Sequence, residues 1–130
     1  MKMKCIVVTP ERTVVDEVAT FVKLPLFDGY YGVAPNHTPV IGRLGAGELL
    51  IRNGDESKSY YVAGGFVEVL NNTVSLMTSR AALASSITPE VAEKALEEAK
   101  SKAKSTPEEM ALREAAIDEA RAMVRLAGKA

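Results

Sequence analysis

The chain has 130 residues, of which 47% are hydrophobic and 25% are charged. This length allows one globular domain with a core, or a small domain with an appendage, and the composition argues against a wholly disordered chain. The 16 basic and 17 acidic side chains give a net charge of −1, so we expect no nucleic-acid binding by a broad basic surface. No apolar run approaches the roughly 20 residues of a membrane helix, and the single cysteine cannot form an internal disulfide. These features predict a cytosolic chain without direct membrane insertion.

Glycine and proline divide the chain into two unlike parts. Eight of the nine glycines and four of the six prolines come before residue 66, and residues 90–127 contain no glycine. The first part is rich in Val, Thr and Tyr, which favour strands, whereas the second is rich in Ala, Glu and Lys, which favour helices. The predicted fold class is therefore α+β, with an antiparallel β-sandwich over residues 1–86 and a two-helix antiparallel hairpin over residues 87–130.

Short β-branched segments separated by turn residues run through the first part. Strands are expected at residues 5–9, 13–16, 19–24, 45–52, 58–63, 66–70 and 73–79. Asn53-Gly54 predicts a type I′ hairpin turn, in which both central residues have positive φ. Gly64-Gly65 predicts a bulge or a close approach of two backbones. Such strands are typical of a sandwich or a flattened barrel, here with a core of Val, Leu, Ile and Phe.

The second part contains two helix starts. Thr88 and Thr106 are N-cap residues, each followed by a proline at the first helical position, and Glu109 completes a capping box. Helical spacing predicts inner rows of Val91, Ala92, Ala95, Leu96, Ala99 and Ala103, then Leu112, Ala116, Ala120, Met123 and Ala127, with Ile117 and Val124 beside the second row. Because alanine buries little area, the hairpin should hold together weakly. It is either a fixed appendage or a unit that can detach and extend.

Sequence motifs for catalysis are missing. There is no G-x-x-x-x-G-K-[ST] loop, and His37 and Cys5 are the only histidine and cysteine from which a metal site or a nucleophile could be built. His37 lies between Pro35 and Pro39, which favours a loop or packing role over a catalytic one. We therefore expect no catalytic residue, no metal site and no enzymatic activity of the chain by itself.

A glycine and proline framework gives the most specific signal. Residues 29–39, GYYGVAPNHTP, resemble the G-x-x-G-[IV]-x-P-x-H-x-P signature of the ε subunits of F-type ATP synthases. Residues 44–47, LGAG, and 62–69, VAGGFVEV, are similar to further segments of that family and follow in the same order. The resemblance covers the whole chain, since the family combines an N-terminal sandwich with a C-terminal helical hairpin.

The resemblance implies a mechanical role in a rotary enzyme complex. The sandwich would bind the γ subunit and the ring of c subunits, and so couple ion-driven rotation of the ring to ATP synthesis. Contact with the c-ring is expected at Asp28, Tyr30, Tyr31 and His37, with the two tyrosines in an exposed, glycine-bracketed loop. Many family members carry an acidic residue where this chain has Tyr30, and Asp28 could supply that charge. The chain would lie on the cytoplasmic face of the inner or plasma membrane, held there by the complex.

The resemblance also implies regulation. In the family the hairpin can rise along γ, contact the catalytic α and β subunits and block ATP hydrolysis. Arg113, Arg121 and Arg125 would then meet acidic loops, although solvation and pairing with nearby carboxylates is the alternative.

Some relatives bind ATP on the folded hairpin through an [IL]-D-x-x-R-A motif in the first helix. Residues 117–122 match that motif, but they lie in the second helix, and residues 87–92 of the first lack its Asp and Arg. Arg121 and Arg125 match arginines that approach ATP in such relatives, so we expect no cofactor and at most weak ATP binding. A free-standing nucleotide sensor and a sandwich interaction module without a rotary partner are the competing functions.

Overall fold

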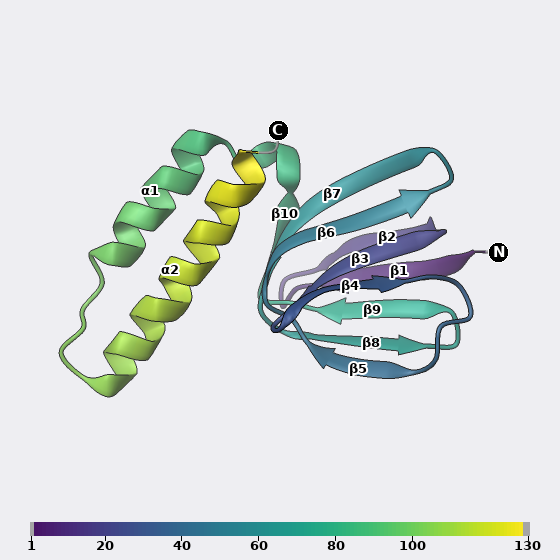
Figure 1. Ribbon diagram of the computed structural model, residues 1–130, viewed down its shortest axis with the longest axis horizontal. Coiled ribbons are helices and arrows are strands. Elements are labelled where there is room, and N and C mark those ends of the chain that lie inside the picture. The colour runs from purple at the N-terminus through teal and green to yellow at the C-terminus, as the bar shows by residue number, and fades with distance from the viewer. Residues whose placement is uncertain (1, 129–130) are drawn as a thin grey trace.

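The computed structural model describes residues 2–128, which form a β-sandwich flanked at one end by two helices (Figure 1). The ten strands are β1 Met3–Val8, β2 Thr13–Ala19, β3 Phe21–Leu26, β4 Gly29–Val33, β5 Val40–Arg43, β6 Ala46–Asn53, β7 Glu56–Ala63, β8 Phe66–Leu70, β9 Thr73–Met77 and β10 Arg80–Leu83. They make two five-stranded sheets, ordered β2-β1-β9-β8-β5 (the first sheet) and β10-β7-β6-β3-β4 (the second sheet). The predicted α+β class, with a sandwich rather than a flattened barrel, is confirmed.

The core lies between the two sheets and is aliphatic. Leu24, Leu49 and Leu76 are among its largest fully buried side chains, and Cys5 and several valines fill the space between them. The expectation that phenylalanine contributes to this core is wrong. Phe27 and Phe66 are exposed, and Phe21 is half-buried on the outside of the second sheet, where Arg52 lies over its ring.

Three strands were not expected, namely β4, β5 and β10. The exposed loop predicted around the two tyrosines is in fact strand β4, which forms one edge of the second sheet. Its two glycines, Gly29 and Gly32, gave a turn signal, but the paired strand β3 holds this segment extended. All three missed strands lie at sheet edges, where half of the hydrogen-bonding groups need no partner and sequence patterns are weakest.

The turns contain residues that tolerate positive φ, but the type I′ turn is at a different hairpin from the one predicted. Both Asn71 and Asn72 have positive φ, 51° and 56°, between the paired ends of β8 and β9, so the type I′ signature occurs there. At the expected site only Gly54 has positive φ, and the type I′ prediction for Asn53-Gly54 is wrong. The predicted close approach at Gly64-Gly65 is confirmed, because a Cβ on Gly65 would lie 1.9 Å from the carbonyl oxygen of Met77.

A 3-10 turn, Ala84–Ser86, leads into the helices α1, Pro89–Lys100, and α2, Pro107–Ala127. Thr88 caps α1 and Thr106 forms the predicted capping box with Glu109. The helix α1 ends before Ala103, so it covers only part of α2. Neither helix in the described part of the chain is long and apolar enough to cross a membrane.

The inner rows predicted for the hairpin are correct only in part. The two helices meet through Ala99, Ile117 and Ala120, but Leu112 is 69% exposed because α2 extends past the end of α1. Val91 and Val124 are also exposed. Met123 and Ala127 are buried as predicted, but they lie with Ala122 and Leu126, which were not anticipated, in a cluster with residues of β7. The helix α2 therefore has two partners, α1 and the sandwich.

Candidate functional site

Strand β4 separates the residues expected to contact the c-ring. Asp28 precedes the strand, in a tight turn after β3, and His37 lies in the connection that follows the strand, so the whole five-residue strand lies between the two sites. Figure 1 shows the β3–β4 turn at the end of the sandwich next to the helices and the β4–β5 connection at the opposite end. Tyr30 and Tyr31 point to opposite faces because side chains alternate along a strand. The structure thus brings together only Tyr31 and His37.

Tyr30 is 55% exposed but firmly anchored on the outer surface of the second sheet. The pairing of β3 with β6 stops at Lys23 and Leu50, and the backbone N–H of Glu48 instead donates to the phenol oxygen of Tyr30, at 3.1 Å. The Lys23 ammonium lies 4.7 Å from the centre of the Tyr30 ring and 2.8 Å from a carboxylate oxygen of Glu48. Tyr30 therefore presents a fixed ring edge beside a charge pair.

Tyr31 and His37 form a pair at the other end of β4. The Tyr31 oxygen is 2.9 Å from Nε2 of His37, and Nδ1 of His37 is 2.7 Å from the carbonyl oxygen of Thr38. A carbonyl oxygen only accepts, so we assign the proton of the neutral imidazole to Nδ1, and the Tyr31 hydroxyl then donates to Nε2. One ring nitrogen of His37 thus ties the connection to β4, and the other bonds to the backbone of the connection itself.

Two asparagines tie the same connection to the β8–β9 turn. The backbone N–H of Asn36 donates to the side-chain oxygen of Asn72 at 2.6 Å, and the Asn72 amide donates back to the Asn36 side chain at 3.2 Å. Both residues have positive φ, which asparagine tolerates better than most residues. The loop between the two sheets is therefore stiff, although its prolines were the only sign of this in the sequence.

The outward surface of the first sheet carries an apolar patch, which we call the outer apolar face. It consists of Val8, Ile41, Phe66, Leu70 and Met77, all exposed, with Ile41 at 79% and Phe66 at 56%. Phe66 is paired with Met77 across β8 and β9, and Met77 with Val8 across β9 and β1, so a continuous row crosses three strands. A groove of about 420 Å³ lies between β5 and β8, lined by Ile41 and Leu70, with Glu68 as its acidic member.

The predicted hairpin arginines lie in two places. Arg113 is at the distal end, where its Nε donates to the backbone carbonyl of Lys100 at 3.3 Å. Arg121 and Arg125 line a groove of about 580 Å³ between α2 and the sandwich, which also contains Arg43 and which we call the arginine groove. Asp118 and Glu119 line the same groove, so its positive charge is partly offset.

Tyr61 joins the sandwich to the hairpin, and its role was not anticipated. It is 2% exposed, and its hydroxyl donates to the backbone carbonyl of Glu119 in α2 at 3.1 Å. The signal available in the sequence was the unbroken apolar run at the end of β7, residues 60–63, because a strand buried on both faces loses its alternation. A second layer on that face of the sheet could have been predicted from this run.

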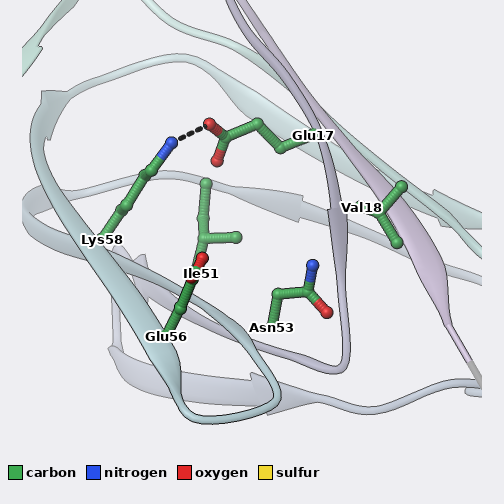
Figure 2. A pocket seen from close by; sticks show the side chains of 6 residues that line it. All are labelled: Glu17, Val18, Ile51, Asn53, Glu56 and Lys58. Atoms are coloured by element: carbon green, nitrogen blue, oxygen red, sulfur yellow. Dashed lines mark hydrogen bonds and ion pairs between the residues drawn. The ribbon is translucent and has the colours of Figure 1, made fainter.

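A small groove of about 240 Å³ opens at the edge of the sandwich, between β2 and β7. Figure 2 shows Glu17 and Lys58 pointing toward each other from these strands, with Nζ of Lys58 2.5 Å from the Glu17 carboxylate. The hydrogen bond to Glu17 is the main cause that raises the pKa of Lys58. This ion pair links the two sheets, which favours a structural over a ligand-binding interpretation of the groove. Within residues 2–128, no cluster of three or more potential metal ligands occurs.

Comparison with known proteins agrees with the fold. The family model described as the beta-sandwich domain of the ATP synthase delta/epsilon chain matches residues 2–84. The chain is 42% identical over 125 residues to an ATP synthase epsilon chain from Rhodopirellula baltica, covering 96% of this chain and 98% of that one. It is 39% identical to a chloroplastic epsilon chain from Chlamydomonas reinhardtii, covering 77% of this chain and 75% of that one.

Among solved structures, a chain of the Euglena gracilis mitochondrial ATP synthase shares the fold, with a TM-score of 0.80 and 23% identity over 94% of this chain and 79% of that one. A chain from the Tetrahymena thermophila central stalk and c-ring gives a TM-score of 0.72 at 17% identity, over 99% of this chain and 96% of that one. The curated relatives are named as epsilon chains of ATP synthase. The chain belongs to the delta/epsilon chain family of ATP synthases.

Proposed function

We propose that this epsilon-family chain is a central-stalk subunit that couples ion-driven rotation of the c-ring, through γ, to ATP synthesis. In this proposal residues 1–86 form the unit that binds γ and the c-ring, and residues 87–130 form a regulatory hairpin that inhibits ATP hydrolysis when it extends. The chain would be peripheral on the cytoplasmic face of the inner or plasma membrane, held by its partners. The outer apolar face, on a rigid sandwich, is the single observation that best supports a binding role.

The outer apolar face supports a permanent protein partner, which we propose is γ. Exposed contiguous apolar surface on a soluble protein marks an interaction site. Phe66 and Met77 offer large side chains in the row across β8 and β9, and the groove lined by Ile41 could accept a side chain of the partner. Glu68 within the groove favours a basic residue of γ opposite it.

Retention of γ by a tagged version of this chain tests that assignment. Changing Ile41 and Phe66 together to Ser should weaken γ binding at least about tenfold, because central apolar contacts carry most of the binding energy. Leu112→Ser is the matched control, since Leu112 is equally exposed but lies on the hairpin. If the double variant holds γ as tightly as the control does, the outer apolar face is not the γ surface.

We propose that the c-ring contacts the β4 edge and its flanking residues, rather than a loop tip. Tyr30 offers an exposed ring, while His37 acts through its hydrogen bond to Tyr31, which shapes the adjoining connection. Asp28, at the other end of the strand, is exposed and could meet a basic or polar group of the ring. Proton-driven ATP synthesis at equal assembly should fall in Tyr30→Ser with Tyr31→Ser, and unchanged synthesis would contradict this contact.

Inhibition by the hairpin is supported by arginine side chains of α2 that form no ion pair with a described residue in the docked state. The three ion pairs among residues 2–128 all involve lysine, so Arg113, Arg121 and Arg125 are not paired with the carboxylates on α2. On an extended helix these arginines could meet acidic loops of the α and β subunits. Changing Arg121 and Arg125 to Ala should then release part of the inhibition while keeping the helix, because alanine favours helix.

The arginine groove supports only weak nucleotide binding. Arg43, Arg121 and Arg125 could approach a phosphate group, but Asp118 and Glu119 line the same groove and would repel it. We therefore expect ATP to bind the isolated chain with a dissociation constant on the order of millimolar or weaker. Calorimetry with ATP checks this, and micromolar binding would instead favour the nucleotide-sensor function.

A further inference from the structure

Tyr61 lies at the interface between the hairpin and the sandwich. It lies on β7 in a buried cluster with Ala63 of the same strand and with Ala122 and Met123 of α2. Burial raises the pKa of Tyr61 to about 12, so the hydroxyl keeps its proton and can donate at alkaline as well as neutral pH. Its acceptor, 3.1 Å away, is the backbone carbonyl of Glu119, which lies inside α2 rather than at a helix end.

The remaining contacts at this interface do not define closely where α2 lies along the sheet. The α2 residues buried there are two alanines, Ala122 and Ala127, together with Met123 and Leu126. Burial of apolar side chains is non-directional and methionine adapts its shape readily, so small shifts of α2 along this surface cost little. A hydrogen bond is different, because it weakens steeply with distance and misalignment. The Tyr61 hydroxyl therefore distinguishes one position of α2 from its neighbours.

We infer that Tyr61 is a positioning residue that fixes α2 in its docked place on the sandwich and holds the hairpin in the docked state. The inference rests on the proposed regulatory function, since it names the contact that sets the balance between docked and extended hairpins. Loss of the hydroxyl shifts this balance toward detachment without altering the sandwich. The chain itself, rather than a bound ligand, supplies the restraint.

The chain offers a matched pair of tyrosines for the test. Tyr61→Phe removes the hydroxyl but keeps the ring that packs against α2, and so should fold normally. Tyr60→Phe makes the same change at the next residue, which packs in the sandwich core. Glu119→Ala is a second control, because it leaves the backbone acceptor in place.

Hydrogen exchange of the isolated full-length chain measures detachment directly. In Tyr61→Phe the amides of α2 should exchange about fivefold faster, as expected for one lost hydrogen bond, while the amides of the first sheet keep their protection. Tyr60→Phe and Glu119→Ala should leave α2 exchange within about twofold of the unmodified chain. Equal exchange in Tyr61→Phe and the unmodified chain, or equal acceleration in Tyr60→Phe or Glu119→Ala, would overturn the inference.

Hydrolysis by the reconstituted complex separates this inference from the function on which it rests. If Tyr61→Phe detaches the hairpin and also changes the inhibition of ATP hydrolysis, the role of Tyr61 and the inhibitory function of the hairpin are both supported. If it detaches the hairpin in the isolated chain but hydrolysis stays the same, Tyr61 still positions α2 and the inhibitory function fails. If truncation of the hairpin raises hydrolysis but Tyr61→Phe leaves α2 exchange unchanged, the regulatory function stands and the role of Tyr61 is refuted.

Discussion

The sandwich and the hairpin bury their surfaces in different ways. Between the sheets, Leu24, Leu49 and Leu76 are each at most 1% exposed, and burying one such side chain contributes about 1.5–3 kcal/mol. The hairpin buries mainly alanine, with Ile117, Met123 and Leu126 as its larger members. The sandwich is therefore the more heavily packed region, and the hairpin is held by fewer large side chains. This difference is what the proposed function requires, in which the sandwich stays attached while the hairpin moves.

The largest expected effect lies in the sandwich core. Leu24→Ala should lower the free energy of unfolding by about 2–5 kcal/mol, because it removes buried methyl groups and leaves a cavity. Urea denaturation followed by circular dichroism measures the change. Leu112→Ala, at an exposed leucine of the hairpin, should change it by less than about 0.5 kcal/mol. Similar losses of unfolding free energy in both variants would contradict the proposed difference in packing between the sandwich and the hairpin.

A smaller effect is expected where the helices meet. Ile117→Ala should weaken the hairpin by about 2 kcal/mol, since Ile117 is the large buried side chain between α1 and α2. Hydrogen exchange should show faster exchange in α2 and unchanged protection in the sandwich. Val91→Ala, at an exposed position of α1, serves as the control. Loss of protection in both regions together would mean that they unfold as one unit.

Alkaline pH should act on the sandwich through Cys5. Burial, with a smaller contribution from Glu17, raises the pKa of this thiol from 9.0 to about 12 in the folded chain. Between these values the unfolded chain has lost the proton that the folded chain keeps, so stability falls as pH rises, by up to about 1.4 kcal/mol per pH unit. Cys5→Ala should be less stable at pH 7 but should lose less stability between pH 9 and 10. An equal loss in both proteins would contradict this assignment.

The smallest effect is expected at the start of α2. Thr106→Ala removes one half of the capping box and should cost about 1 kcal/mol, confined to the first turns of the helix. Exchange of the amides at the start of α2 measures it, and Ser105→Ala at the preceding position is the control. A change that spreads to the sandwich would show tighter coupling between the regions than their small apolar interface implies.

Local chemistry explains what could be predicted from the sequence. Thr88 and Thr106 marked the helix starts because capping involves only neighbouring residues. Gly65 marked a close approach because no other residue fits beside the Met77 carbonyl. The interpretation of residues 28–32 as a loop failed because an edge strand is decided by its partner, here β3. The four residues expected at the c-ring were predicted to share one contact, whereas a strand separates Asp28 from His37.

Interfaces between distant elements account for the remaining misses. The role of Tyr61 depends on α2, 58 residues further along the chain, and nothing beside Tyr61 identifies that partner. The burial of Ala122 and Leu126 likewise depends on the sandwich, because helical spacing alone predicted only the face toward α1. The exposed Phe66 was assigned to the core for the same reason: alternation along β8 shows two faces but does not say which is covered.

ATP hydrolysis by the reconstituted complex, with either the full chain or residues 1–86, most directly tests the division of labour between the two regions. The truncated chain keeps all ten strands and the interior core, so it should fold and retain γ. The prediction is that hydrolysis is faster with residues 1–86 than with the full chain, at equal occupancy of γ. Equal rates at equal occupancy, with and without preincubation with ATP, would contradict the inhibitory role of the hairpin.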